Sequence, residues 1–139
     1  MKIVAQVRSQ YQMHLAEVTT NGRESTLPIP VAASGFGSSV NGGELLFLAL
    51  ATCYCNDLYR EAGKRDIVLT YANVEVTGSF GGPGEPARDI TYQVQLAGDA
   101  DRDDLIALAH HTDTVAEIQN TVRLGLPVTL ASVEVANTW

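Results

Sequence analysis

Residues 41–63 of the chain are NGGELLFLALATCYCNDLYREAG, and they contain both of its cysteines. We predict that this stretch forms one helix. Asn41 suits the N-cap because its amide oxygen can accept a hydrogen bond from a free backbone N–H of the first turn, and Glu44 makes something close to a capping box. Gly63 is predicted to close the helix, since glycine adopts the left-handed conformation without steric cost.

The same stretch has almost no polar face between Leu45 and Cys55. A helix that is apolar on every side is a buried helix. The apolar run is shorter than the roughly 18 residues that a membrane span requires, so the covering partner is expected to be protein. Because a small domain has little material to bury such a helix, we predict a homodimer with this central helix at its interface.

Length, charge and cysteine spacing limit the remaining choices. The chain has 139 residues and is 45% hydrophobic, which predicts a single domain over residues 1–139. Its net charge of −7 has the wrong sign for binding nucleic acid or an anionic membrane surface. The first residues, MKIVAQVRSQ, contain no export signal, so we expect a cytoplasmic protein. Cys53 and Cys55 point about 200° apart on a helix and are expected to be free thiols.

Alternating apolar and polar residues predict five strands around this helix and one at the C-terminal end. Residues 2–7 and 14–20 alternate, and Asn21-Gly22 is a strong hairpin signal that leads into a return strand over residues 23–28. Residues 66–80 and 90–96 alternate on either side of the turn GGPGEPARD and predict a long antiparallel hairpin. A last strand is expected from Pro127 to about Val135, with a bulge.

Two shorter helices are predicted between this hairpin and the last strand. Acidic residues from Asp101 to Asp104 suit the positive end of a helix, and apolar residues recur on one of its faces. Residues 114–117, TVAE, have the pattern of a capping box for a further helix, which Gly125 is expected to close. The complete pattern predicts an α+β fold.

This order of elements, together with two short motifs, resembles the OsmC/Ohr family. Members typically open the central helix with N-P-E-x-L and carry A-x-C later in it; the matching residues here are 41–45, NGGEL, and 51–53, ATC. The family's R-x-G-x-x-V ending matches residues 123–128, RLGLPV. The resemblance implies an OsmC-like α+β fold, in which two antiparallel sheets surround a central buried helix and dimerisation completes the structure.

The resemblance also implies thiol-dependent reduction of organic hydroperoxides, with Cys53 as the candidate peroxidatic thiol. In catalytic members a Glu and an Arg hold the attacking sulfur as a thiolate. The Glu position falls on Gly43 here, which leaves Glu44 as the candidate acid, and Arg8 and Arg23 are both available as the arginine. The family's second cysteine corresponds to Ala116, so an external thiol reductant would be required.

Other interpretations of these residues remain open from the sequence. A cysteine among leucines and alanines is often a small buried apolar residue, which applies to Cys53 and more strongly to Cys55. The alternative function is a non-catalytic dimer that binds a small hydrophobic ligand at the subunit interface. His110 and His111 are adjacent on a helix and face different directions, so we expect no metal there, and we expect no cofactor.

Overall fold

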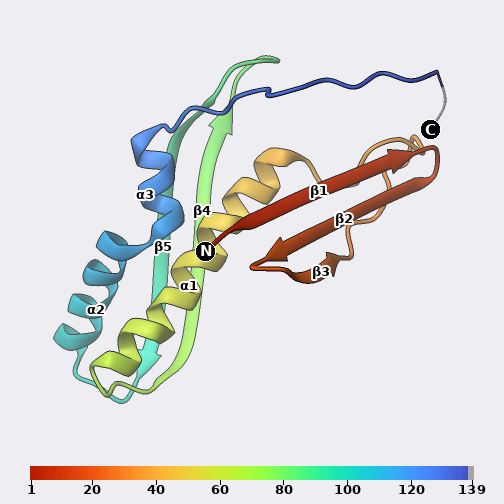
Figure 1. Cartoon of the computed structure of the whole chain (residues 1–139). Coiled ribbons are helices and arrows are strands. Elements are labelled where there is room, and N and C mark those ends of the chain that lie inside the picture. The colour runs from red at the N-terminus through yellow and green to blue at the C-terminus, as the bar shows by residue number, and fades with distance from the viewer. Residues whose placement is uncertain (138–139) are drawn as a thin grey trace. The chain divides into compact units, whose positions relative to one another are not determined.

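A computed structural model describes residues 1–137 and confirms the α+β class. Its elements, in chain order, are β1 (Ile3–Gln10), β2 (Met13–Thr20), β3 (Arg23–Leu27), α1 (Gly42–Lys64), β4 (Leu69–Phe80), β5 (Ala87–Gly98), α2 (Arg102–Val115) and α3 (Glu117–Leu124) (Figure 1). The chain divides into two compact units. The first holds Met1–Leu48 with Phe80–Arg88, and the second holds Ala49–Ser79 with the chain from Asp89 onward. That the whole chain is one domain stays a prediction.

The first unit contains an antiparallel sheet in the order β1-β2-β3. The predicted turn between β2 and β3 is confirmed: Asn21 and Gly22 both have positive φ angles, 49° and 82°, as the favoured two-residue hairpin turn requires. The turn between β1 and β2 also uses a left-handed residue, Gln12, with φ 60°. No Asn or Gly marks that turn in the sequence. Every residue of β1 is exposed within this chain.

The start of α1 agrees with the sequence in detail. The Asn41 side-chain oxygen accepts a hydrogen bond from the backbone N–H of Glu44 at 2.8 Å, and the Glu44 carboxylate accepts one from the backbone N–H of Asn41 at 3.0 Å. These reciprocal bonds form the predicted capping box.

The prediction that Gly63 closes α1 is wrong, although the helix ends only one residue further on, at Lys64. Gly63 lies inside the helix, and the left-handed residue is Asp66, with φ 55°. The backbone N–H of Ile67 bonds the carbonyl of Ala62 at 3.0 Å, as in a Schellman motif, and Ile67 packs against the core cluster that contains Ala62. The left-handed residue and the apolar contact that close the helix therefore lie three and four residues beyond the expected glycine.

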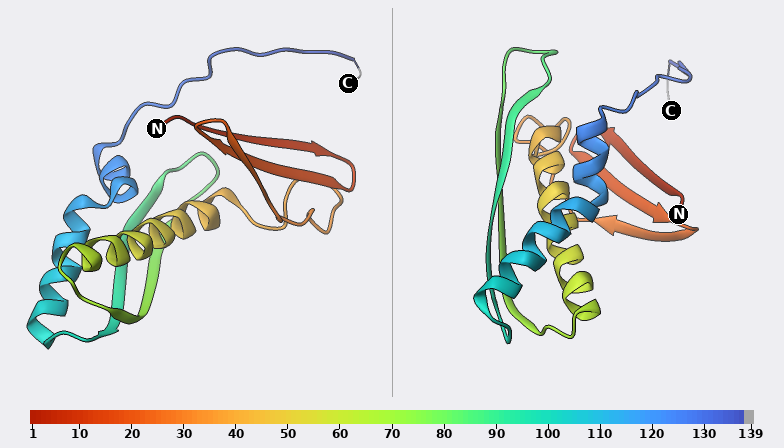
Figure 2. Two further views of the ribbon diagram at one scale, coloured as in Figure 1. Left: turned by 60° about the horizontal axis from the view of Figure 1, so that its bottom comes forward. Right: turned by 90° about the vertical axis from the view of Figure 1, so that its left-hand side faces the viewer.

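In the second unit, the three helices lie on one face of the β4–β5 hairpin (Figures 1 and 2). Side-chain hydrogen bonds across the two strands confirm the hairpin, one between Asn73 and Gln95 and one between Thr77 and Thr91. The residue numbers of both pairs have the same sum, as an antiparallel register requires. The buried cluster joins α1, α2 and the start of α3; it consists of Tyr54, Leu58, Ala62, Leu108 and Ala116.

Burial of α1 is less complete than its sequence predicts. Its buried residues from Leu50 to Ala62 recur every three or four positions and form one face, whereas Leu48 is 61% exposed. In residues 1–137 no helix is long and apolar enough to cross a bilayer. The fold thus confirms two small antiparallel sheets and three helices, while dimerisation stays a prediction.

The caps of the later helices are only partly as predicted. The hydroxyl of Thr114 donates to the His111 carbonyl at 2.6 Å, instead of capping the next helix. Ala116 occupies the N-cap of α3 without a side-chain hydrogen bond, so the predicted capping box is wrong. Gly125 closes α3 in the left-handed conformation, with φ 60°, as predicted.

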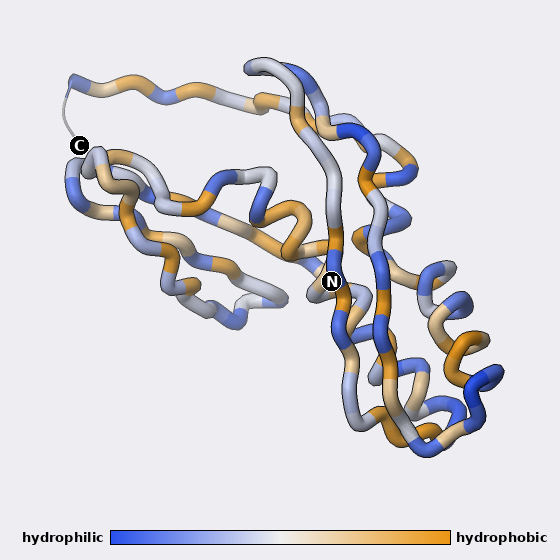
Figure 3. Tube along the Cα trace, turned by 180° about the vertical axis from the view of Figure 1, so that it is seen from behind, coloured by the Kyte–Doolittle hydropathy of each residue, from blue (hydrophilic) through white to orange (hydrophobic). Residues whose placement is uncertain are grey.

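The predicted strand over residues 127–135 is also wrong, because this segment is extended chain without strand pairing in the described structure. Apolar residues recur along it (Figure 3), and its exposed residues include Val128, which is 99% exposed. A strand requires a neighbouring strand to supply hydrogen-bond partners. The alternation of apolar and polar residues correctly predicted an extended chain, but it does not show whether another strand lies beside it.

Candidate functional site

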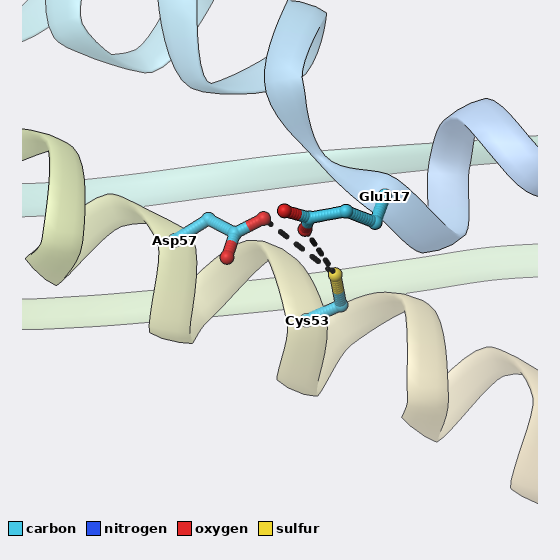
Figure 4. A group of neighbouring side chains, drawn as sticks. All are labelled: Cys53, Asp57 and Glu117. Carbon is cyan, nitrogen blue, oxygen red and sulfur yellow. Dashed lines mark hydrogen bonds between the residues drawn. The ribbon is translucent and has the colours of Figure 1, made fainter. Parts of the chain in front are cut away.

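The candidate site lies where the middle of α1 meets the start of α3. The sulfur of Cys53 is 3.6 Å from Oδ2 of Asp57, which lies one turn further along α1. It is 3.7 Å from Oε2 of Glu117, the first residue of α3 (Figure 4). A thiol is therefore placed between two carboxylates.

Helix geometry and core packing together build this arrangement. Residues four apart lie on the same face of a helix, so Asp57 is next to Cys53 for a local reason. Glu117 follows Ala116, which is fully buried in the core cluster. The side-chain amide of Gln119 donates to the Leu50 carbonyl at 2.9 Å and ties α3 to α1. These contacts hold Glu117 beside the thiol.

Arg60 binds the outer side of both carboxylates. Its Nη1 lies 3.0 Å from Oδ1 of Asp57 and 3.2 Å from Oε1 of Glu117. These are not the oxygens that face the sulfur. Each carboxylate thus uses one oxygen for the guanidinium and presents the other to Cys53.

This environment favours a protonated thiol. Burial raises the pKa of Cys53, and the neighbouring charges of Asp57 and Glu117 raise it further, whereas the backbone N–H of Ile118 lowers it. Burial also raises the pKa of Asp57, with a further contribution from its hydrogen bond to Glu117. The pKa of Glu117 is lowered by a backbone N–H and by that same hydrogen bond. The nearby arginine is shared by two acids and leaves the thiol without a dedicated cation.

A family model described as "OsmC-like protein" matches residues 35–131, which is more than half of the chain. The chain belongs to the OsmC-like protein family. Among the curated proteins none matches it.

Solved structures agree with this OsmC-like fold at low sequence identity. An OsmC-like protein from Mycoplasma pneumoniae is 16% identical, with a TM-score of 0.60 over 86% of this chain and 87% of that one. The organic hydroperoxide resistance protein OhrB of Bacillus subtilis is also 16% identical, with a TM-score of 0.52 over 88% and 91%. An OsmC-like hydroperoxide resistance protein from Jannaschia sp. is 15% identical, with a TM-score of 0.51 over 98% and 93%.

The other three residues that the sequence suggested for the site belong to the first unit. Arg8 on β1 forms an ion pair of 2.8 Å with Glu17 on the neighbouring strand. Glu44 is engaged in the cap of α1, and Arg23 begins β3. Cys53 belongs to the second unit. The assignment of Arg8, Arg23 and Glu44 to a site with Cys53 stays a prediction.

Sequence reasoning did not single out Asp57, Arg60 or Glu117. The spacing of Cys53, Asp57 and Arg60 along one helix was a usable signal, because residues three and four apart are neighbours. Glu117 had no local signal, since it lies 64 residues from Cys53 in the chain.

Cys55 lies in a different environment on the same helix. It lines a cavity of about 270 Å³ together with residues of α1 and β4, and none of these lining residues is charged: Ala51, Thr52, Asn56, Ala72, Asn73 and Val74. Both cysteines are free, as the sequence predicted from their spacing.

Proposed function

We propose that this OsmC-like protein reduces organic hydroperoxides through Cys53, with an external thiol as the reductant. The observation that supports the proposal is the packing of Cys53 against the start of α3, where its sulfur lies 3.7 Å from the residue after Ala116. The resemblance to the OsmC/Ohr family implies that Ala116 takes the position of the second cysteine of catalytic members. Two of the similar structures are named as hydroperoxide resistance proteins.

The reaction would begin with attack of the Cys53 thiolate on the terminal oxygen of the hydroperoxide. The O–O bond breaks, the leaving alkoxide takes a proton to become an alcohol, and the sulfur becomes a sulfenic acid. One external thiol then condenses with the sulfenic acid, releasing water and forming a mixed disulfide. A second external thiol regenerates Cys53 and leaves as half of a small disulfide.

The ionisation of the thiol would limit this chemistry, because only the thiolate is nucleophilic. Burial and the two carboxylates beside Cys53 raise the pKa of its thiol, so turnover should be slow at neutral pH. As part of the same proposal, Glu44 together with Arg8 or Arg23 would stabilise the Cys53 thiolate. The need for a reduced thiol pool fits a cytoplasmic location.

The sharpest test restores the missing cysteine with Ala116→Cys. If Cys53 is peroxidatic, one equivalent of cumene hydroperoxide should convert this variant to an intramolecular disulfide, detectable by mass. Because an intramolecular thiol has a very high effective concentration, turnover with a dithiol should rise by at least about tenfold. Ala116→Ser is the matched control and should show neither effect.

The wild-type protein supplies the outcome that would overturn the proposal. Its Cys53 should gain one oxygen or a small-thiol adduct after the same treatment. An unmodified Cys53 in both wild type and Ala116→Cys would rule out the peroxidase. That result would favour the non-catalytic OsmC-like dimer that binds a small hydrophobic ligand.

We also propose that the protein is a homodimer, which the exposure of two apolar segments supports. Ile3, Val4 and Val7 of β1 are exposed, as are apolar residues throughout the segment 126–135. Exposed apolar surface on this scale is typical of an interaction site. Light scattering at micromolar concentration should give twice the mass of one chain, and a monomer would contradict the proposal.

A further inference from the structure

The three side chains around Cys53 have the geometry of a metal site. The sulfur, one oxygen of Asp57 and one oxygen of Glu117 lie within 4.8 Å of one another. In a tetrahedral zinc site, the usual Zn–S and Zn–O bond lengths place sulfur and oxygen about 3.5 Å apart. The observed separations of the sulfur from the two oxygens are 3.6 and 3.7 Å. Both sulfur–oxygen separations therefore match those of a tetrahedral zinc site.

Among the described residues, the inner oxygen of the Asp57 carboxylate is met only by the other members of this cluster, and it accepts a hydrogen bond from the Cys53 thiol. The Asp57 side chain is 8% exposed. Arg60 binds Oδ1, but within residues 1–137 no group outside the cluster binds Oδ2, which points at Cys53. A buried carboxylate oxygen is costly unless a donor or a cation meets it. When the Cys53 thiol is ionised that donor is lost, and a metal ion between the three ligands would take its place.

Arg60 occupies the position of an outer-sphere partner. It binds the oxygens of Asp57 and Glu117 that face away from the sulfur, and so it orients both carboxylates without blocking the inner oxygens. Metal-binding carboxylates are commonly held in this way. The charges also balance, because a thiolate, two carboxylates, a divalent cation and one guanidinium sum to zero.

We propose that Cys53, Asp57 and Glu117 bind a Zn²⁺ ion, with the fourth position open to water. Zinc fits this set because it accepts both thiolate and carboxylate ligands in tetrahedral geometry, whereas magnesium and calcium prefer oxygen ligands alone. Coordination to zinc would draw electron density from the sulfur and slow its attack on a hydroperoxide. Zinc binding and peroxide reduction would therefore compete for the same thiol.

The test uses Co²⁺ as a spectroscopic substitute for Zn²⁺ on the full-length, pre-reduced protein. Wild type should develop a sulfur-to-cobalt charge-transfer band that saturates at one equivalent per chain and disappears when Zn²⁺ is added. Cys53→Ser should lose the band, while Cys55→Ser, the matched control, should keep it. Removing the outer partner with Arg60→Met should weaken binding by about 10- to 100-fold.

Glu117→Gln tests the carboxylate ligands with the least risk to folding, because this side chain is largely exposed. It should weaken Co²⁺ binding more than Arg60→Met does, with an unchanged circular dichroism spectrum. The proposal is overturned if wild type gives no charge-transfer band, or if the band survives in Cys53→Ser. These measurements use no hydroperoxide, so their outcome is independent of whether the protein is a peroxidase.

Discussion

Cys53 and Cys55 lie on one helix, two positions apart, in very different surroundings. Cys53 faces the start of α3 and has the carboxylates of Asp57 and Glu117 within 3.7 Å. Cys55 points about 200° away around the helix and lines a cavity with uncharged residues of α1 and β4. The difference shows that the chemistry of a cysteine depends on what packs against its side of the helix. It also makes Cys55 the natural control for every experiment on Cys53.

The largest expected difference between the two thiols is in hydroperoxide turnover. Cys53→Ser should reduce consumption of cumene hydroperoxide, with a dithiol as reductant, to the rate of the uncatalysed reaction. Cys55→Ser should leave the rate unchanged, because its side chain is on another side of the helix. Equal loss of activity in both variants would show that the comparison between the two environments is mistaken.

The next difference is in the pH dependence of Cys53. Because burial and two acids raise the pKa of its thiol, little thiolate exists at neutral pH. Below that pKa the thiolate fraction grows about tenfold per pH unit. Alkylation by iodoacetamide in the presence of a chelator should therefore be slow at pH 7 and keep rising above pH 9.

Peptide mass spectrometry follows both cysteines in the same sample of that experiment. The rate at Cys53 should be lower than the rate at Cys55 near pH 7. A Cys53 rate that is already constant between pH 6 and 8 would mean that the thiol is ionised, contrary to its carboxylate surroundings.

The smallest expected effect comes from removing one acid beside Cys53. Asp57→Asn or Glu117→Gln deletes a negative charge that raises the pKa of the thiol, so alkylation of Cys53 at pH 7 should accelerate. The expected gain is about two- to tenfold, which corresponds to a shift of up to one pKa unit. Alkylation of Cys55 measured in the same protein should not change. If Cys53 slows instead, these carboxylates assist the thiolate rather than oppose it.

Features set by neighbouring residues were predictable from the sequence. The capping box of Asn41 and Glu44, the Asn21-Gly22 turn and the closure of α3 at Gly125 all formed as predicted. Each depends on hydrogen bonds or backbone angles within about four residues. The spacing motifs that resemble the OsmC family are equally local, and the family model matches across them.

The errors arose where local preference competes with packing. Gly63 had the right residue type to close α1, but the closing left-handed residue is Asp66, which lets Ile67 pack on the core. The alternation of residues 127–135 was correct for extended chain, but no strand pairs with it in the described structure. In both cases a contact between distant parts of the chain, or its absence, outweighed a valid local signal.

The sequence by itself determined the class of fold, the family and the thiol at the centre of the candidate site. Only the tertiary structure decided what surrounds that thiol. Glu117 lies 64 residues from Cys53 along the chain, and burial of Ala116 with the bond from Gln119 to Leu50 places it there. The pKa and metal-binding capacity of a thiol depend on charges within a few ångströms. The distance between Cys53 and Glu117 cannot be read from neighbouring residues in the sequence, because it is set when α3 packs against α1.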